Sequence, residues 1–190
     1  RTNAEAPKGI LASNTQLMKE IPPFDQWLSR CYNILKPDSH IYIMTNFHEL
    51  YSMMTEVKNA GFEMHNLLVW EKNTSTPNRW YMKNCEYTIF ARKGNIKTIN
   101  NPSSKTVHHF TNPTGKIHPA EKPVELMEHY ITNSTKENDI VLDPFMGTGT
   151  TGVACKNTYR EFIGIEIDKE YYDIAMNRVE NTTRLDKFFG

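Results

Sequence analysis

The chain has 190 residues, in which 22 lysines and arginines balance 22 aspartates and glutamates. This length suits one domain, and the zero net charge excludes a histone-like basic protein and an acidic disordered tail. The mean hydropathy of −0.60 and the lack of an apolar run near the roughly 20 residues that cross a bilayer exclude an integral membrane protein. The three cysteines are far apart and follow no metal-ligand or disulfide spacing, which favours a reduced, cytoplasmic setting.

Hydrophobic patterns along the chain predict alternating helices and strands. Residues 1–20 are polar and without a clear period, and we expect them to form a loop. Apolar residues at three- and four-residue steps predict a helix at residues 23–35. Further helices are expected at residues 47–60, closed by Gly61, at residues 123–133, with a proline in the first turn, and at residues 150–157 and 169–181. Short β-branched or aromatic runs predict strands at residues 40–45, 62–71, 85–92, 140–142 and 162–167. This alternation is typical of an α/β domain with a mostly parallel sheet and helices on both faces.

The segment from residue 94 to residue 117 breaks this alternation. It is rich in Asn, Ser, Thr, Pro and Lys, and we expect a long structureless surface loop inserted into a single domain, residues 1–190. Loops of more than about 15 residues in compact domains are usually functional or disordered. His108 and His109 have no acidic residue or cysteine nearby in the sequence, so we interpret them as part of the polar loop and predict no metal site.

The sharpest local signal is a glycine-rich turn between a predicted strand and a predicted helix, residues 143–152 (DPFMGTGTTG). Glycines let the backbone turn tightly and approach a ligand, while the start of a helix presents unpaired N–H groups. Glu166 follows the next strand, where a carboxylate can accept hydrogen bonds from two ribose hydroxyls. The combination predicts a site for a nucleoside cofactor.

The same glycines, from Gly147 to Gly152, satisfy the dinucleotide fingerprint GxGxxG, so an NAD-dependent enzyme is an alternative. Asp143 argues against it, because a carboxylate would repel a pyrophosphate but suits a ligand that bears an ammonium and a sulfonium group. A purely structural turn between strand and helix is a further interpretation.

Three ordered segments carry a family resemblance: residues 118–123 (HPAEKP), 143–151 and 162–171. Together they resemble the S-adenosylmethionine-dependent DNA methyltransferases that modify exocyclic amino groups of adenine or cytosine, in the circularly permuted branch with the cofactor loop near the C-terminus. The resemblance implies a Rossmann-like class I methyltransferase fold and S-adenosylmethionine as the cofactor. It implies a reaction without metal, in which the amino group of a flipped base attacks the sulfonium methyl group in line. Adenine is favoured as the commoner target.

The resemblance also assigns cofactor contacts to single residues. Asp143 would lie near the amino group of the cofactor, Glu166 would hold the ribose, and Ile167 would pack on the adenine ring. The contacts around the methionine and sulfonium end would be Pro144, Phe145, Gly147, Gly149, Thr150 and Thr151. The residues that close the site over the carboxylate tail would be His118, Lys122 and Pro123.

The family places the reacting base with a segment of Asp-Pro-Pro-Tyr or Ser-Pro-Pro-Tyr type, and the chain contains no match to it. Residues 21–24 (IPPF) have two prolines and an aromatic, but an apolar first position cannot accept a hydrogen bond from the target amine. In the permuted order, we expect this segment upstream of Arg1, at the end of a strand that is central in the sheet. Catalytic residues therefore stay unassigned, and an inactive cofactor-binding or partner subunit is the alternative to an enzyme.

Charge is unevenly distributed along the chain. Between Lys72 and Lys116 there are eight basic residues and one glutamate, a net charge of +7 that leaves −7 for the remainder. Because phosphate contacts supply most nonspecific DNA affinity, we expect double-stranded DNA to bind here, with residues 94–117 as the candidate target-recognition region. The candidate contacts are Lys72, Arg79, Trp80, Lys83, Lys97 and Lys105. An RNA methyltransferase and a cytosine-N4 DNA methyltransferase are alternatives that the sequence allows. We expect a cytoplasmic restriction–modification enzyme encoded by a bacterium or a phage.

Overall fold

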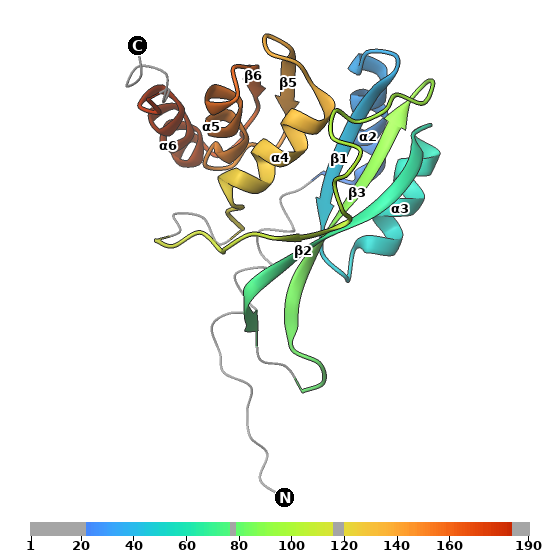
Figure 1. Cartoon of the computed structure of the whole chain (residues 1–190), viewed down its shortest axis with the longest axis horizontal. Coiled ribbons are helices and arrows are strands. Elements are labelled where there is room, and N and C mark those ends of the chain that lie inside the picture. Colours follow the sequence, from blue (N-terminus) through green and yellow to red (C-terminus); the bar gives the residue numbers. More distant parts are fainter. Residues whose placement is uncertain (1–21, 77–78, 116–119, 184–190) are drawn as a thin grey trace, which may run out of the picture.

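Helices and strands alternate along most of the chain (Figure 1). The computed structural model describes residues 22–76, 79–115 and 120–183, so the loop expected at residues 1–20 lies outside the described residues. The elements are α2 (Phe24–Ile34), β1 (Ser39–Thr45), α3 (Leu50–Asn59), β2 (Glu63–Thr76), β3 (Lys83–Lys93), β4 (Val107–His109), α4 (Val124–Ser134), β5 (Ile140–Asp143), α5 (Thr150–Asn157), β6 (Glu161–Gly164) and α6 (Lys169–Glu180). In this part of the chain, no helix is long and apolar enough to cross a membrane.

Local chemistry explains where the helices begin and end. Asn46 Oδ1 accepts a hydrogen bond from the backbone N–H of His48 at 2.8 Å, just before α3. Gly61, with φ +98°, ends that helix in a conformation that glycine adopts without strain. The ammonium group of Lys93 donates to the carbonyl oxygens of Tyr32 and Leu35 at 2.5 and 2.8 Å, at the C-terminal end of α2. The predicted helix boundaries are therefore confirmed to within a few residues.

The described strands form two sheets, one four-stranded in the order β1-β3-β2-β4 and one two-stranded with β5 beside β6. The β5–β6 pair is parallel, as the alternation of elements predicts, and β2 also pairs in parallel with β4, a strand that the sequence does not predict. The β1–β3 and β2–β3 pairs are antiparallel. The β2–β3 pair is antiparallel because these strands follow each other without an intervening helix, and a short connection joins only antiparallel neighbours. Since α3 connects β1 to β2 and these two strands run in the same direction, β1 is antiparallel to β3 as well.

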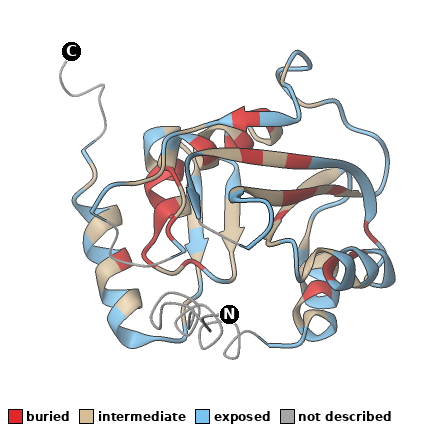
Figure 2. Cartoon of the chain, turned by 90° about the horizontal axis from the view of Figure 1, so that it is seen from below, coloured by how far each residue is buried: buried red, intermediate tan, exposed pale blue. Residues whose placement is uncertain are grey.

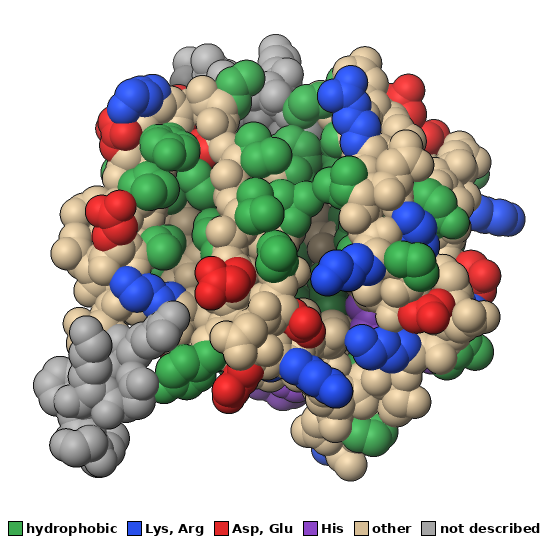
Figure 3. Space-filling view, turned by 90° about the horizontal axis from the view of Figure 1, so that it is seen from above, with side chains coloured by type: hydrophobic (Ala, Val, Ile, Leu, Met, Phe, Trp, Pro, Cys, Tyr) green, Lys and Arg blue, Asp and Glu red, His purple; other side chains and the backbone are tan. Residues whose placement is uncertain are grey.

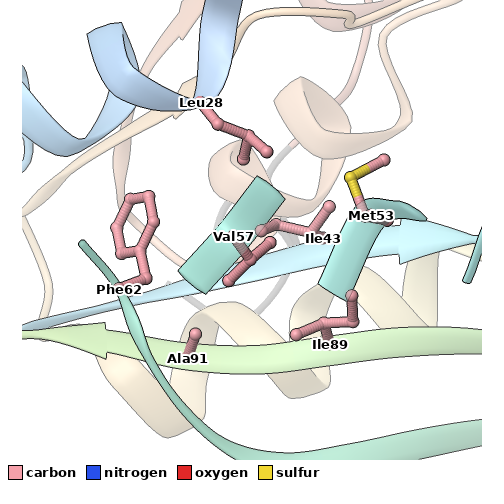
Figure 4. Close-up of a cluster of buried hydrophobic side chains, with 7 residues drawn as sticks. All are labelled: Leu28, Ile43, Met53, Val57, Phe62, Ile89 and Ala91. Carbon is pink, nitrogen blue, oxygen red and sulfur yellow. The ribbon is translucent and has the colours of Figure 1, made fainter. Parts of the chain in front are cut away.

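Helices cover both faces of the four-stranded sheet. On one face, α2 and α3 bury Leu28 and Val57 against Ile43, Ile89 and neighbouring apolar side chains (Figure 4). Successive side chains of a strand point to opposite faces of the sheet, so the same strands also present apolar side chains to the other face. There they pack against α4. Figure 2 shows the buried residues in the middle of the strands and on the inward helix faces. The predicted α/β arrangement with helices on both faces is confirmed.

The helix α4 also contacts the second sheet. Leu126 and Tyr130 belong to the cluster with Trp70 of β2, whereas Ile131 packs with Ala154 and Cys155 of α5. The α5 cluster in turn includes side chains of β5 and β6. One helix therefore contributes buried side chains to the cores of both sheets.

The expectation of a structureless loop at residues 94–117 is wrong at Val107–His109, whereas the other described residues of that segment form no helix or strand. Residues Val107–His109 form β4, which extends the sheet beside β2. Trp70 Nε1 donates a hydrogen bond to the carbonyl oxygen of Phe110 at 2.8 Å. His108 is buried, with 7% of its surface exposed, and its ring lies 4.7 Å from the ring of His129. The sequence pattern misses this strand because the segment buries an imidazole in place of aliphatic side chains.

We predict that acid weakens the packing of β4 against α4 through His108. Burial lowers the pKa of His108 to about 4, and the charges of His129 and His109 add to the shift. Because an unfolded chain holds a histidine near its ordinary pKa of about 6.5, the unfolded state binds more protons between these two values. The free energy of unfolding should be highest above this range and fall by about 2 kcal/mol between about pH 7.5 and about pH 5, measured by urea unfolding.

His108→Phe provides the control, because it keeps an aromatic ring and removes the titrating nitrogens. Among the described residues, His108 Nε2 has no hydrogen-bond partner to lose. The variant should be at least as stable as the wild type at neutral pH and less sensitive to acid. An equal loss of stability in both proteins would show that another group is responsible.

Candidate functional site

The glycine-rich turn begins where β5 ends, and hydrogen bonds tie it to both neighbouring elements. The carboxylate of Asp143 accepts from the backbone N–H of Phe145 at 3.0 Å and from the hydroxyl of Thr151 at 2.6 Å. The backbone N–H of Met146 donates to the carbonyl oxygen of Ile165 at 3.0 Å, just after β6. The turn therefore has a defined shape, held at the carboxyl ends of two parallel strands.

Two glycines of the turn adopt left-handed backbone conformations, Gly147 with φ +51° and Gly149 with φ +81°. A Cβ atom added to Gly149 would lie 2.9 Å from Cβ and 3.0 Å from Cα of Ala175 on α6, so the turn and this helix are in close contact. A Cβ added to Gly147 would meet no described atom within 4 Å. Gly149 thus serves packing, whereas Gly147 leaves its backbone open to a ligand.

The carboxylate of Glu166 lies directly beside this open backbone. Its Oε2 accepts from the N–H of Gly147 at 2.9 Å, and its Oε1 accepts from the N–H of Asp168 at 2.9 Å. Each oxygen keeps a second acceptor position, which suits the paired hydroxyls of a ribose. The next side chain, Ile167, is 90% exposed and offers an apolar surface for a flat ring. These residues fit the nucleoside end of a cofactor.

Asp143 has a different environment from the one that the sequence predicts. Burial raises the pKa of the Asp143 carboxyl, the hydrogen bonds from Thr151 and Phe145 oppose this, and the charge of Glu166 raises the pKa further. Both carboxylate oxygens are used inside the turn. Asp143 therefore holds the turn in shape, and its contact with the amino group of a cofactor stays a prediction.

The segment before α4 was predicted to close the site. His118 lies outside the described residues, and Pro123 is buried at the N-terminal end of α4. Lys122 Nζ lies 2.5 Å from Glu86 Oε2, and Lys72 pairs with the same carboxylate. Burial of Glu86 disfavours its charge, but the two ammonium groups outweigh this and hold its pKa below the ordinary value. A contact between Lys122 and a cofactor stays a prediction. In such a contact, the ammonium group of Lys122 would bind the cofactor and Glu86 at the same time.

Sequence reasoning missed three residues that contact the turn or its closing segment. The ring of Trp27 on α2 meets that of Phe145 edge-on, with 5.1 Å between ring centroids. Arg178 on α6 pairs with Glu121 at 2.7 Å. The sequence marks Trp27 as part of the apolar stripe of its helix and of the family resemblance, but gives it no contact with the turn, and Glu121 belongs to the resembling segment without an assigned role. Nothing in the local pattern of α6 marks Arg178, because its partners are distant in sequence.

The candidate nucleic-acid contacts fall into two groups. Trp80 and Tyr81, in the turn between β2 and β3, are 84% and 94% exposed, so ordinary core packing does not explain them. This hairpin projects from the body of the molecule (Figure 1). The exposed candidates are Arg79, Trp80, Lys83, Lys97 and Lys105, whereas Lys72 is in the pair with Glu86.

The net charge of +7 overstates the cationic surface of this segment. Besides Lys72, Arg92 pairs with Glu63, and Lys93 donates to carbonyl oxygens at the end of α2. On the face drawn in Figure 3, Lys and Arg side chains are interspersed with Asp and Glu around a hydrophobic area. Cationic charge that can meet phosphate is therefore concentrated in the hairpin turn and at scattered lysines. Among the described residues, no three His, Cys, Asp or Glu side chains gather as a metal site.

Comparison with known proteins decides the family. A family model described as DNA methylase matches residues 21–177. The chain belongs to the DNA methylase family. It is 33% identical over 174 residues to the type II methyltransferase M2.LlaDCHI of Lactococcus lactis subsp. cremoris, covering 81% of this chain and 65% of that protein. It is 34% identical over 175 residues to M2.DpnII of Streptococcus pneumoniae, covering 82% and 65%. The chain thus spans 65% of the length of these curated relatives.

Solved structures confirm the predicted Rossmann-like fold of this DNA methylase family member. The crystal structure of an M1.HpyAVI–SAM complex matches with a TM-score of 0.73 at 34% identity, covering 83% of this chain and 85% of that one. The cytosine-N4-specific PvuII DNA methyltransferase matches with a TM-score of 0.72 at 18% identity, covering 87% and 74%, which is a likeness of fold.

We predict that the two glycines of the turn respond differently to alanine. Gly149→Ala combines left-handed strain with overlap on Ala175, so the free energy of unfolding should fall by about 3 kcal/mol. Gly147→Ala, the matched control, has the strain without the overlap and should lose only about 1 kcal/mol. Urea unfolding measures both, and equal losses would contradict the close contact between the turn and α6.

Proposed function

We propose that the chain contains the cofactor-binding unit of an S-adenosylmethionine-dependent DNA methyltransferase that acts on the exocyclic amino group of adenine. The observation that carries the proposal is the hydrogen bond from Gly147 to Glu166, which sets a carboxylate beside open backbone and the exposed Ile167. Family membership and the structure of the M1.HpyAVI–SAM complex support it.

S-adenosylmethionine supplies an activated methyl group when it is bound. In this chain, Glu166 would accept hydrogen bonds from the ribose hydroxyls, and Ile167 would cover one face of the adenine ring. Phe145 and the backbone of Gly147 would face the methionine end, because both are accessible in the turn. Thr150 is buried, and the hydroxyl of Thr151 donates to Asp143, so both would act by holding the turn.

We propose that the segment that places the reacting base belongs to a strand between β1 and β5. In the described chain, β1 is the last strand on one side of the four-stranded sheet, and β5 has β6 as its partner. The contact between Trp27 and Phe145 brings the start of α2 close to the end of β5. Trp27 Nε1 is buried and has no hydrogen-bond partner among the described residues. An additional segment at this place would supply an acceptor for it.

The alternative is a cofactor-binding partner subunit without activity of its own. The absence of a Pro-Pro-Tyr segment in the chain favours it. Transfer of labelled methyl groups from S-adenosylmethionine to duplex DNA by the whole protein, together with any residues that precede Arg1, decides between the two, and analysis of the digested nucleosides identifies the base. Methyladenine is the expected product. Cofactor binding without any methyl transfer would favour the partner subunit.

We further propose that double-stranded DNA contacts the hairpin between β2 and β3. Exposed aromatic rings beside cations suit stacking on bases together with phosphate contact. A cytoplasmic role in restriction and modification is part of this proposal, because the relatives are type II methyltransferases of bacteria.

We predict that Glu166→Ala weakens binding of S-adenosylmethionine by about tenfold to a hundredfold, the usual effect of losing hydrogen bonds to a charged group. Calorimetric titration of the whole chain measures this. Glu161→Ala is the control, because Glu161 is an exposed glutamate at the other end of β6. Equal affinities in the two variants would mean that the ribose site is misplaced, and a wild-type chain that binds no cofactor at millimolar concentration would overturn the proposed function.

We predict that two lysines of the cationic segment contribute differently to DNA affinity. Lys83→Gln removes an exposed charge at the base of the hairpin and should reduce the slope of log K against log salt by about 1. Lys72→Gln should leave the slope unchanged and lower stability by about 1 kcal/mol, because Lys72 pairs with the largely buried Glu86. Fluorescence titrations with a duplex at several salt concentrations measure the slopes. A larger effect from Lys72 would contradict this assignment.

A further inference from the structure

An arginine on α6 contacts two separate segments at the candidate site. Arg178 Nη2 lies 2.7 Å from Glu121 Oε1, in the segment that precedes α4. Arg178 Nη1 lies 3.2 Å from both the carbonyl oxygen and the hydroxyl oxygen of Thr148, between the two glycines of the turn. The planar guanidinium has separate donors for the two segments, which the single nitrogen of a lysine does not provide.

Burial makes this contact hard to break. The side chain of Glu121 is 7% exposed, and a buried carboxylate without a cationic partner is strongly destabilising. Thr148 is also buried, and its neighbours are held independently: Gly147 by Glu166 and Gly149 by close contact with Ala175. A shift of Glu121 must therefore move Arg178 and change the hydrogen bonds that orient the Thr148 peptide.

We infer that Arg178 is a positioning residue that couples the segment before α4 to the glycine turn and thereby sets the affinity for the methionine end of the cofactor. The inference rests on the proposed function. In that assignment the turn faces the methionine end, whereas Glu166 and Ile167, at the end of β6, hold the adenosine end. Loss of Arg178 should therefore affect the two ends of the cofactor unequally.

The test compares S-adenosylmethionine with adenosine, which lacks the methionine tail, by calorimetry on the whole chain. Arg178→Gln should raise the Kd for S-adenosylmethionine about tenfold, as expected for loss of charge-assisted hydrogen bonds, and change the Kd for adenosine less than about twofold. Arg178→Lys keeps the charge beside Glu121 without the planar fork. It should give an intermediate Kd for S-adenosylmethionine and a melting temperature close to that of the wild type.

Lys156→Gln is the matched control for a general loosening of α6. Lys156 Nζ donates to the carbonyl oxygens of Val179 and Glu180 at 2.7 Å each, so it anchors the end of α6 from α5. This variant should lower the melting temperature and leave the ratio of the two affinities unchanged. A selective loss of S-adenosylmethionine affinity in Lys156→Gln as well would overturn the specific role of Arg178.

The outcomes separate the inference from the proposed function. If the wild-type chain binds neither ligand, the proposed function fails. The positioning role is overturned if the wild type binds both ligands and Arg178→Gln binds each of them as tightly as the wild type does. It is also overturned if Arg178→Gln loses affinity for both ligands by the same factor. If Arg178→Gln does not fold, Arg178→Lys and Glu121→Gln carry the test. Glu121→Gln should show the same selective loss, and its effect should not add to that of Arg178→Lys, because both act on one contact.

Discussion

The glycine turn between β5 and α5 keeps its shape because two carboxylates accept hydrogen bonds from its backbone. Asp143 holds the turn from the end of β5, and Glu166 holds it from beyond β6. The Asp143 contact is local to the turn, whereas the Glu166 contact requires the two strands to lie side by side in parallel register, Asp143 opposite Gly164. The shape of the site therefore depends on one pair of short strands, whose packing depends in turn on α5 and α4.

Much of the fold could be predicted because most of the helices and the long strands have a hydrophobic pattern of their own, and α5 follows a glycine motif. The stripe of α2, the runs of β1 and β3, and the glycines before α5 are local signals, and the structure confirms them. β4 could not be predicted, because its burial depends on contacts of His108 with residues of α4 that lie about twenty positions further along the chain. Pairing between β1 and β3 is likewise a property of the assembled sheet.

In the candidate site, too, a local sequence motif predicts some contacts, whereas others depend on residues that are distant in the sequence. Glu166 and the glycines occur in a motif, so their proximity could be expected, and the hydrogen bond between Glu166 and Gly147 agrees with it. Ion pairs are less accessible to sequence reasoning. Lys72, Arg92 and Lys93 raise the apparent charge of the segment, yet each is engaged within the protein. Net charge along a sequence cannot distinguish a cation that meets solvent from one that stabilises a neighbouring element, because that depends on tertiary contacts.

The position of α4 between two cores has a consequence for the order in which the chain folds during synthesis. The strands β1, β2 and β3 and the helices α2 and α3 precede it, so one face of the four-stranded sheet can be covered as soon as these elements have emerged. Its other face, with Leu68 and Trp70, stays uncovered until α4 arrives. Domains fold as they leave the ribosome, and exposed apolar surface at that stage favours aggregation. Between the synthesis of β3 and that of α4, this apolar face of the nascent sheet therefore has no helix to cover it.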